Sequence, residues 1–381
     1  MKILHLIYTS GISGAEKYLK HLLPGLKNQG IDCSLIIVCS RDTYPVLSKI
    51  RDEFNEVGVE TSLLIYPKLS FISAAKEINK YCIKKDIKII HSHLSNSDLI
   101  AVLVKKLFNK KITLISTKHG YQEKVLQEYE PGNLIPNKNL YYYVTKYLQK
   151  NIDKNFAVSK ALANLYYDFG LTEKEFPVIH HGVTIPGFDK QEFEQKCRKA
   201  EQQLIIVGRI EQFKGHRFLM EAMVEVIKLF PFCKLLVVGE GSSRKQLETQ
   251  IDFLKIKKNV EFLGFQPHPY SYISNSDVII LPSLFEPFGL VYIEAFALKI
   301  PVVAFDTAAG NEIMENNITA LMVPKGNSKL LARQIIYLLQ NKEESTRITS
   351  NAYEVYKDKF TTSTMIENTA RWYKNNLPMD N

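Results

Sequence analysis

The chain has 381 residues, of which 45% are hydrophobic and 23% charged, and its formal net charge is +9. This composition is typical of a globular protein with a sizeable core, and the length favours two or three domains. No apolar stretch approaches the length of a signal peptide or a transmembrane helix, so a cytoplasmic protein is expected. The cysteines show no CxxC spacing and are expected to be reduced: Cys33, Cys39, Cys82, Cys197 and Cys233.

Strand-like apolar runs alternate with helical stretches along the whole chain. In the first half, strands are predicted at 2–7, 34–38, 62–65, 88–91, 113–116, 155–158 and 178–180. In the second half, they are predicted at 204–207, 235–238, 260–263, 278–281, 302–305 and 321–323. This alternation predicts an α/β protein with two doubly wound, Rossmann-like domains, over residues 1–185 and 186–361. Pro186-Gly187 breaks the chain at the boundary, and a last helix is predicted within 362–381.

The motifs of the first half follow predicted strands, where open parallel sheets bind ligands. The segment Thr9 to Glu16 contains Gly11 and Gly14, whose small size permits close approach of the backbone to a ligand, although a plain strand–helix turn reads the same way. His93 and His119 each follow a strand, and a histidine there can bond sugar hydroxyls. A lone histidine is more often structural, which is the expectation for His180-His181.

The first half is also basic. Residues 1–185 contain 25 Lys and Arg against 17 Asp and Glu, whereas residues 186–381 contain 24 against 23. The run from Lys105 to Lys154 combines lysines with Tyr141-Tyr142-Tyr143, a mixture that suits either contact with an anionic membrane surface or a buried tyrosine face on a helix. No His, Asp or Cys set has the sequence spacing of a metal site and there is no Asp-x-Asp, so no metal is expected.

In the second half, cations and glycines follow the strands. Arg209 lies at a strand end and Lys214 five residues on, before a helix predicted at 216–228, so both could hold a diphosphate. The competing reading is a surface ion pair of Arg209 with Glu211. Gly239 and the pair Gly264-Phe265 follow the next two strands and are weaker signals.

The strand at 278–281 leads into two carboxylates, Glu286 and Glu294, eight residues apart. Glu286 is predicted to lie in a loop, and Glu294 in the second turn of a helix that starts at Leu290. The amides of the helix N-terminus, at Phe288, Gly289, Leu290 and Val291, form an anion site. An anion site between two carboxylates suits a ligand with phosphates and hydroxyls, such as a sugar nucleotide.

The segment 285–304 resembles the E-x7-E motif of the retaining glycosyltransferases of family 4, and the Gly14 loop and the Arg209–Lys214 spacing are similar to this family's patterns, with Ser13 in place of a glycine. The resemblance implies a GT-B fold with two domains facing a cleft and a C-terminal helix that returns to the first domain. It implies that Glu294 holds ribose hydroxyls and Glu286 sugar hydroxyls. Arg209, Lys214 and the amides of Gly14, Leu290 and Val291 would hold the diphosphate.

The resemblance further implies that His119 lies beside the transferred sugar, that Gly239 and Gly264-Phe265 lie along the nucleotide, and that the leaving phosphate acts as base in a front-face displacement. We therefore expect a metal-independent, retaining hexosyltransferase without a cofactor other than its nucleotide-sugar substrate, with a UDP-sugar favoured over a GDP-sugar. The expected acceptor is a glycan or a lipid-linked sugar in bacterial cell-surface polysaccharide synthesis, with weak peripheral contact to the inner face of the cell membrane. The alternatives are another GT-B enzyme, such as a sugar-nucleotide epimerase or a phosphorylase, and a basic nucleic-acid-binding protein, although no nucleic-acid-binding motif is found.

Overall fold

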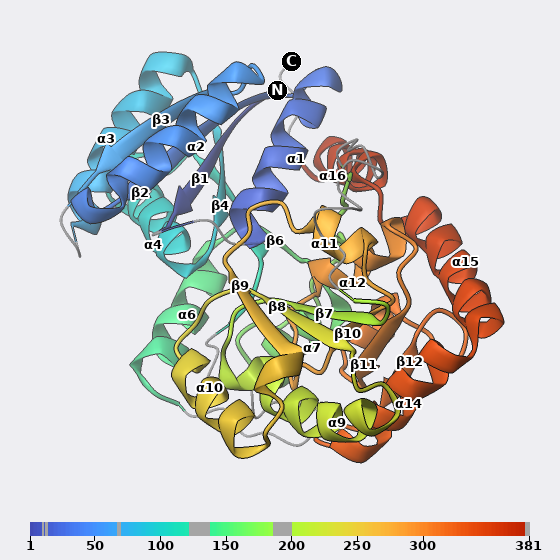
Figure 1. Ribbon diagram of the computed structural model, residues 1–381. Helices are drawn as coiled ribbons and strands as arrows, with labels where there is room; N and C mark the ends of the chain where they lie inside the picture. The colour runs from blue at the N-terminus through green and yellow to red at the C-terminus, as the bar shows by residue number, and fades with distance from the viewer. Residues whose placement is uncertain (10, 12–13, 67–69, 122–137, 186–199, 378–381) are drawn as a thin grey trace. The chain divides into compact units, whose positions relative to one another are not determined.

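The computed structural model describes residues 1–9, 11, 14–66, 70–121, 138–185 and 200–377 (Figure 1). The chain divides into two compact units: Met1–Gly182 together with Thr362–Asn381, and Val183–Thr361. None of the helices in the described ranges combines the length and the apolar character that crossing a membrane requires.

The first unit is built on a six-stranded, parallel sheet with the order β3-β2-β1-β4-β5-β6. Its strands are β1 (Lys2–Tyr8), β2 (Asp32–Cys39), β3 (Glu60–Ile65), β4 (Ile89–His93), β5 (Thr113–Lys118) and β6 (Lys154–Ala157). Its helices are α1 (Gly14–Asn28), η1 (Arg41–Thr43), α2 (Tyr44–Glu56), α3 (Phe71–Lys85), α4 (Ser95–Leu103), η2 (Val104–Phe108), α6 (Leu140–Asn151), α7 (Lys160–Asp168) and α16 (Thr362–Asn376).

Helices cover both faces of this sheet, because its central strands are apolar on both sides. Successive side chains of a strand point to opposite faces, so Ile3 and Ile7 of β1 join a core with α1 and α16, whereas Leu4 and Leu6 join a core with α3 and α4. The same alternation decides on which face each polar side chain of these strands lies.

The second unit repeats this architecture with a six-stranded, parallel sheet in the order β12-β11-β10-β7-β8-β9. Its strands are β7 (Gln203–Val207), β8 (Lys234–Val238), β9 (Val260–Gly264), β10 (Val278–Leu281), β11 (Val302–Phe305) and β12 (Leu321–Val323). Its helices are η3 (Gln212–Lys214), α9 (His216–Leu229), α10 (Arg244–Phe253), η4 (Lys257–Asn259), α11 (Tyr270–Ser274), α12 (Leu290–Ala297), α13 (Gly310–Ile313), α14 (Ser328–Gln340) and α15 (Lys342–Lys359).

The last helix, α16, packs against α1 of the first unit. Met365, Ala370 and Tyr373 belong to the same apolar core as α1. The indole of Trp372 lies edge-on to Phe156, with ring centroids 5.1 Å apart, and the Tyr373 hydroxyl is hydrogen-bonded to His91 Nδ1. The expected return of the C-terminal helix to the first domain is therefore confirmed.

The strand predicted at 178–180 is wrong. Val178 makes a single isolated bridge to Ala157, and no ladder follows. The amide of Ala157 donates to the carbonyl oxygen of Pro177, and the amide of Ile179 donates to that of Ala157. The pairing ends there, because β6 ends at Ala157 and Pro177 has no N–H to donate. An apolar run beside a proline was therefore mistaken for a strand.

Candidate active site

Four loops meet at the carboxyl edge of the second sheet, because the strands β10, β7, β8 and β9 that they follow are neighbours. Backbone hydrogen bonds tie the loops to each other: Gly208 N to Val238 O at 2.9 Å, Gly239 N to Gly264 O at 2.8 Å, and Leu284 N to Phe213 O at 2.7 Å. The predicted motifs after these strands thus form one continuous edge of the second unit.

Gly215 allows two of these loops to touch. Its φ of +70° favours glycine, and a Cβ at this position would collide with the carbonyl oxygen of Pro282. The close approach brings the end of η3, where Lys214 lies, to the loop after β10, where Glu286 lies. Residues that are 72 positions apart in the chain therefore meet.

Glu286 is the centre of this contact. Its side chain is buried, and its Oε1 accepts hydrogen bonds from Lys214 Nζ at 2.5 Å and from Ser283 Oγ at 2.8 Å. A buried carboxylate requires such partners, because desolvation without them costs several kcal/mol. Sequence reasoning identified Lys214 and Glu286 but missed Ser283, for which the only signal is its place between β10 and Glu286.

Arg209 and Lys214 both approach the ring of Phe213. The Arg209 guanidinium carbon lies 5.4 Å from the ring centroid, and Lys214 Nζ lies 5.5 Å from it. Arg209 is exposed, whereas Lys214 is partly buried. The two cations predicted to hold a diphosphate thus share one aromatic neighbour at the end of β7.

Glu294 lies in α12, in the second turn as predicted, and is buried. Gly289 is the N-cap of α12 with a φ of +104°, and a Cβ there would collide with the ring of Tyr292. Glycine offers no capping side chain, and no side chain in the described part of the protein caps α12, so its first amides, at Leu290 and Val291, can serve another acceptor. Phe288, by contrast, is buried in the apolar core.

Each of the two carboxylates has a buried tyrosine as a neighbour. Burial, and then the negative charge of Glu286, raise the pKa of Tyr292 well above its ordinary value. Burial, and then Glu294, raise the pKa of Tyr270. Both tyrosines are therefore neutral and leave the charge at this edge to the carboxylates and the cations. Phe265, after β9, is 58% exposed and is not part of the core.

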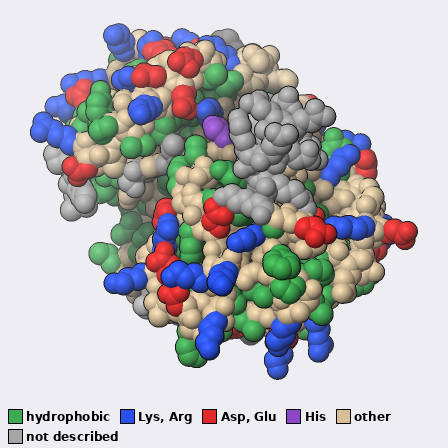
Figure 2. Space-filling model, viewed as in Figure 1, with side chains coloured by type: hydrophobic (Ala, Val, Ile, Leu, Met, Phe, Trp, Pro, Cys, Tyr) green, Lys and Arg blue, Asp and Glu red, His purple; other side chains and the backbone are tan. Residues whose placement is uncertain are grey.

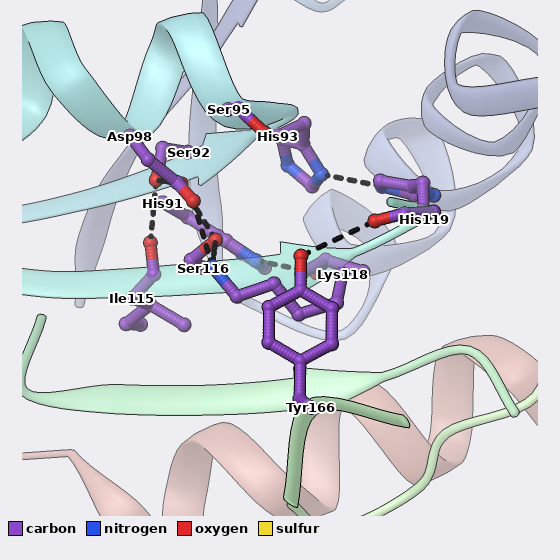
Figure 3. A network of polar contacts seen from close by, with 12 residues as sticks. His91, Ser92, His93, Ser95, Asp98, Ile115, Ser116, Lys118, His119 and Tyr166 are labelled. Atoms are coloured by element: carbon purple, nitrogen blue, oxygen red, sulfur yellow. Dashed lines mark hydrogen bonds and ion pairs between the residues drawn. The ribbon is translucent and has the colours of Figure 1, made fainter. Parts of the chain in front are cut away.

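In the first unit, strand alternation sorts the polar residues of β4 and β5 between the two faces of the sheet. His91 and His93 share one face, and His5 of β1 lies opposite His91 in the register. Ser92, Ser116 and Lys118 share the other face, where they all contact Asp98 of α4 (Figure 3). Sequence reasoning missed His5, His91 and Asp98, because the pairing of distant strands brings them together.

The histidines are linked in series. His5 Nδ1 lies 3.1 Å from His93 Nε2. His93 Nδ1 lies 3.0 Å from His119 Nε2 (Figure 3). His91 instead bonds the hydroxyls of Tyr373 and Thr117. Burial lowers the pKa of His5 to about 3 and that of His119 to about 3, and it lowers the pKa of His91 and His93 well below 6.5. Of the residues predicted to bind substrate in this unit, the structure brings His93 and His119 together.

Asp98 and Lys118 form a buried ion pair 2.7 Å long. Asp98 Oδ1 also accepts hydrogen bonds from the hydroxyls of Ser92 and Ser116, at 2.6 Å each (Figure 3). Burial lowers the pKa of Lys118, and the charge of Asp98 opposes this shift. Both oxygens of the carboxylate thus have donors, and this network ties α4 to β4 and β5 just before His119.

The glycine loop after β1 is described only in part. Gly14 is the first residue of α1, and Glu16 in its first turn is buried. Ser10, Ile12 and Ser13 lie outside the described residues. Residues 122–137, which follow His119 closely in the chain, also lie outside them.

One group in the described part of the chain has the spacing of a metal site. His5, His91 and His93 each offer a ring nitrogen, and these nitrogens lie within 4.8 Å of one another. No local sequence pattern indicates this group, because its members lie on two strands, β1 and β4, that are far apart in the chain. The Lys214–Glu286 contact lies in the other unit and is not part of it.

Two parallel Rossmann-like sheets with a C-terminal helix that returns to the first unit define the GT-B class of proteins. The structure of HepE from Anabaena in complex with UDP and glucose matches with a TM-score of 0.80 over 98% of this chain and 100% of that chain, at 18% identity. A glycosyltransferase structure from Rickettsia africae matches with a TM-score of 0.78 over 98% of both chains, at 22% identity. The predicted fold class is therefore confirmed.

Sequence comparison places the chain in a family within this class. Residues 12–185 match the family model described as Glycosyltransferase Family 4, and residues 187–355 match the model of Glycosyl transferases group 1. An "N-acetylgalactosamine-N,N'-diacetylbacillosaminyl-diphospho-undecaprenol 4-alpha-N-acetylgalactosaminyltransferase" of Campylobacter jejuni is 25% identical over 88% of this chain and 89% of its own. An "uncharacterized 41.2 kDa protein in cps region" of Klebsiella pneumoniae is 26% identical over 91% of this chain and 93% of its own. The chain belongs to the retaining glycosyltransferases of family 4, enzymes that use nucleotide-sugar donors.

Proposed function

We propose that this protein transfers a hexose from a UDP-sugar to a glycan or lipid-linked acceptor, with retention of the anomeric configuration, in the synthesis of a bacterial cell-surface polysaccharide. The observation that carries the proposal is the Lys214–Glu286 contact at the carboxyl edge of the second sheet, beside Arg209 and the N-terminus of α12. Cations, helix amides and a carboxylate at one edge suit a ligand that carries both phosphates and hydroxyls.

Within this site, we assign the diphosphate to Arg209, Lys214 and the amides of Leu290 and Val291. On the family resemblance alone, the amide of Gly14 in the first unit is assigned to the diphosphate as well. The positive charges and the helix dipole stabilise the negative charge that grows on the leaving phosphate as the glycosidic bond breaks. That phosphate then accepts the proton of the attacking hydroxyl on the same face of the sugar. No protein nucleophile takes part in this scheme.

The two carboxylates recognise hydroxyl groups. Lys214 and Ser283 both donate to Oε1 of Glu286, so among the described residues Oε2 is the oxygen left for a hydroxyl of the sugar. Glu294 is assigned to the ribose hydroxyls, with the loops at Gly239 and Gly264-Phe265 along the nucleotide. His119 is assigned to the transferred sugar, and His93 acts behind it.

A UDP-sugar is favoured because HepE, a solved structure of the same fold, has been crystallised with UDP-glucose. A lipid-linked acceptor and a place at the inner face of the cell membrane are supported by the undecaprenol acceptor named for the Campylobacter relative and by an alpha-monoglucosyldiacylglycerol synthase of Acholeplasma laidlawii, which is 26% identical over 91% of this chain.

The test is nucleotide release by the purified full-length protein from a panel of UDP-, GDP- and ADP-sugars, with and without undecaprenyl-diphosphate-linked acceptors. We expect release that depends on both a UDP-sugar and an acceptor, and a product whose new bond keeps the anomeric configuration of the donor, as read by NMR.

The outcomes separate the alternatives. Acceptor-dependent release with a GDP- or ADP-sugar alone would contradict the UDP assignment, and an inverted product would contradict retention. Conversion of the nucleotide sugar without an acceptor would indicate an epimerase, and sugar transfer only to or from free phosphate would indicate a phosphorylase.

A further inference from the structure

We infer that His5, His93 and His119 form one directional hydrogen-bond chain that fixes His119 as the tautomer with its proton on Nδ1. His5 and His93 are then positioning residues, which act on the substrate only through His119. The inference rests on the proposed function in one respect, the assignment of His119 to the transferred sugar. The chain itself is a property of the first unit alone.

The chain follows from the sheet. His5 lies on β1 and His93 on β4, the neighbouring strand, while His119 directly follows β5. Two hydrogen bonds connect them in series: His5 Nδ1 to His93 Nε2 at 3.1 Å, and His93 Nδ1 to His119 Nε2 at 3.0 Å (Figure 3 shows the second). Both ring nitrogens of His93 are therefore used within the chain.

The three rings are neutral at neutral pH, because burial lowers the pKa of each. A neutral imidazole has one N–H and one lone pair. His93 must therefore accept on one side and donate on the other, and the two bonds run in the same direction. Either all three histidines carry the proton on Nδ1, or all three carry it on Nε2.

The ends of the chain decide the direction. His5 Nε2 is buried without a hydrogen-bond partner among the described residues, and so is His119 Nδ1. A buried N–H without a partner is rarer than a buried acceptor without one. Both terminal nitrogens are buried, but His5 is completely buried as a residue whereas His119 is partly exposed, so only the His119 end lies where a bound ligand can bring an acceptor. We therefore place the N–H on His119 Nδ1 and the lone pair on His5 Nε2, with a substrate oxygen as the acceptor for His119.

A metal ion would use these nitrogens differently. Coordination needs the lone pairs of His5 and His93 to point at the ion, and their mutual hydrogen bond would be lost. His91, the third member of the group, already bonds the hydroxyls of Tyr373 and Thr117 with its two nitrogens. The hydrogen bonds of His5, His93 and His91 among the described residues are thus accounted for without a metal ion.

The direct test is NMR of the full-length protein labelled with ¹⁵N-histidine, because the two-bond ¹⁵N–¹H correlations of an imidazole show which nitrogen carries the proton. We expect His5, His93 and His119 all to be protonated on Nδ1. A proton on Nε2 of any one of the three would overturn the inference, as would stoichiometric zinc that His5→Phe removes. The NMR measurement does not require enzymatic turnover, so its outcome is independent of whether the proposed function is correct.

Two matched variants test whether His5, at the end of the hydrogen-bond chain away from His119, helps to position His119. His5→Phe cuts the chain, whereas His91→Phe removes an equally buried ring that contacts both His5 and His93 but lies outside the chain. We expect His5→Phe to give a mixture of His119 tautomers and a five- to tenfold lower kcat/KM, the size of one hydrogen bond. His91→Phe should leave the His119 tautomer unchanged.

His216, a buried histidine of the second unit, serves as the reference signal that should move in neither variant. Equal effects of the two variants on His119, or none from His5→Phe, would refute the positioning role. If His5→Phe does not fold, the tautomers of the unmodified protein decide the question.

Discussion

At the scale of single residues, the proposed chemistry of the second unit depends on the two anions that Lys214 contacts, Glu286 and the diphosphate of the donor. Lys214 bonds the buried carboxylate of Glu286, which Ser283 also supports. When a diphosphate is bound, the proposed role of Lys214 is to contact both the phosphates and Glu286, and the proposed role of Arg209 is to bind the phosphates. Removing either cation should therefore affect the transition state more than the fold.

We predict that Arg209→Ala and Lys214→Ala each lower kcat/KM by roughly 10²–10³-fold, the loss typical of removing one donor to a developing charge. Steady-state kinetics with the best donor measures this effect, and circular dichroism checks the fold. Arg217→Ala is the matched control, because Arg217 is an exposed cation on α9 that packs over Phe218. Near-normal kcat/KM in both single variants would show that the diphosphate lies elsewhere.

The residues that sequence reasoning identified are those whose signal is local. Arg209, Lys214 and Glu286 each follow a recognisable strand within a few positions, so a motif read along the chain is enough to find them. His5 and Asp98 could not be found in this way, because their partners lie 88 and 20 positions away on other elements. Such contacts depend on strand order and register, which the sequence pattern alone leaves open.

At the scale of elements, the structure confirms twelve of the thirteen predicted strands, because parallel strands covered on both faces are continuous apolar runs that stand out in a sequence. The thirteenth, at 178–180, has the same apolar character but lacks a partner that could extend the ladder. The helix α12 begins at Leu290 as predicted, since Pro287 and Gly289 mark its start in the sequence.

The N-terminus of α12 and the two cations lead to a prediction about metals. Helix amides, Arg209 and Lys214 together supply the positive potential that a diphosphate needs, so we expect activity to survive EDTA. The measurement is the initial rate after treatment with chelator and gel filtration, compared with an untreated sample. Loss of activity that magnesium or manganese restores would contradict a metal-independent mechanism.

The central strands of the first unit predict how stability depends on pH. Burial lowers the pKa of His5 and His119 to about 3, against about 6.5 in the unfolded chain, and it lowers those of His91, His93 and His181 as well. Between pH 6.5 and 3 the unfolded chain therefore binds more protons than the folded one. The free energy of unfolding should fall with falling pH, by up to about 1.4 kcal/mol per pH unit for each histidine.

Urea denaturation followed by the fluorescence of Trp372 tests this prediction, since the chain has one tryptophan and it lies in the first unit. The midpoint should be lower at pH 5 than at pH 7.5, and His91→Phe, which takes up one proton fewer on unfolding, should show a shallower dependence. Equal midpoints at the two pH values would contradict it.

At the scale of the whole molecule, charge is distributed unevenly, with most of the surplus of Lys and Arg in residues 1–185. Lys and Arg side chains are nevertheless mixed with Asp and Glu over the face in Figure 2. Around η2, Lys106, Lys110 and Lys111 are exposed, as are Leu107 and Phe108. Lysines beside exposed apolar side chains are typical of contact with an anionic membrane surface.

In the basic run from Lys105 to Lys154, some side chains belong to the core of the first unit or to ion pairs, and others are exposed at its surface. Tyr142 is buried and donates its hydroxyl hydrogen to Phe169 O, whereas Tyr143 and Tyr147 are exposed. Lys105 forms an ion pair with Asp153 at 2.5 Å, so we leave it out of the membrane-binding set. The run thus contributes both to the core of the first unit and to its surface.

We predict weak, salt-sensitive binding to anionic vesicles through this surface, with about 1 kcal/mol from each lysine near the membrane. Lys106→Glu, Lys110→Glu and Lys111→Glu combined should reduce sedimentation with such vesicles at low salt. Lys255→Glu, Lys257→Glu and Lys258→Glu combined, at exposed positions of the second unit, make the same change in net charge and serve as control. Sedimentation no greater than with neutral vesicles would refute the prediction.

The return of α16 to the first unit also determines the order in which the protein can be completed on the ribosome. Residues 1–182 emerge from the ribosome early. The surface of α1 at Gly25 is covered only when Ile366 has been synthesised, and His91 gains its partner only with Tyr373, near the end of the chain. The second unit is one uninterrupted stretch, so it can finish folding before translation ends. The first unit is therefore synthesised first but completed last. In a nascent chain that is halted before Thr362, helix α16 is missing from the core of the first unit, and His91 lacks Tyr373.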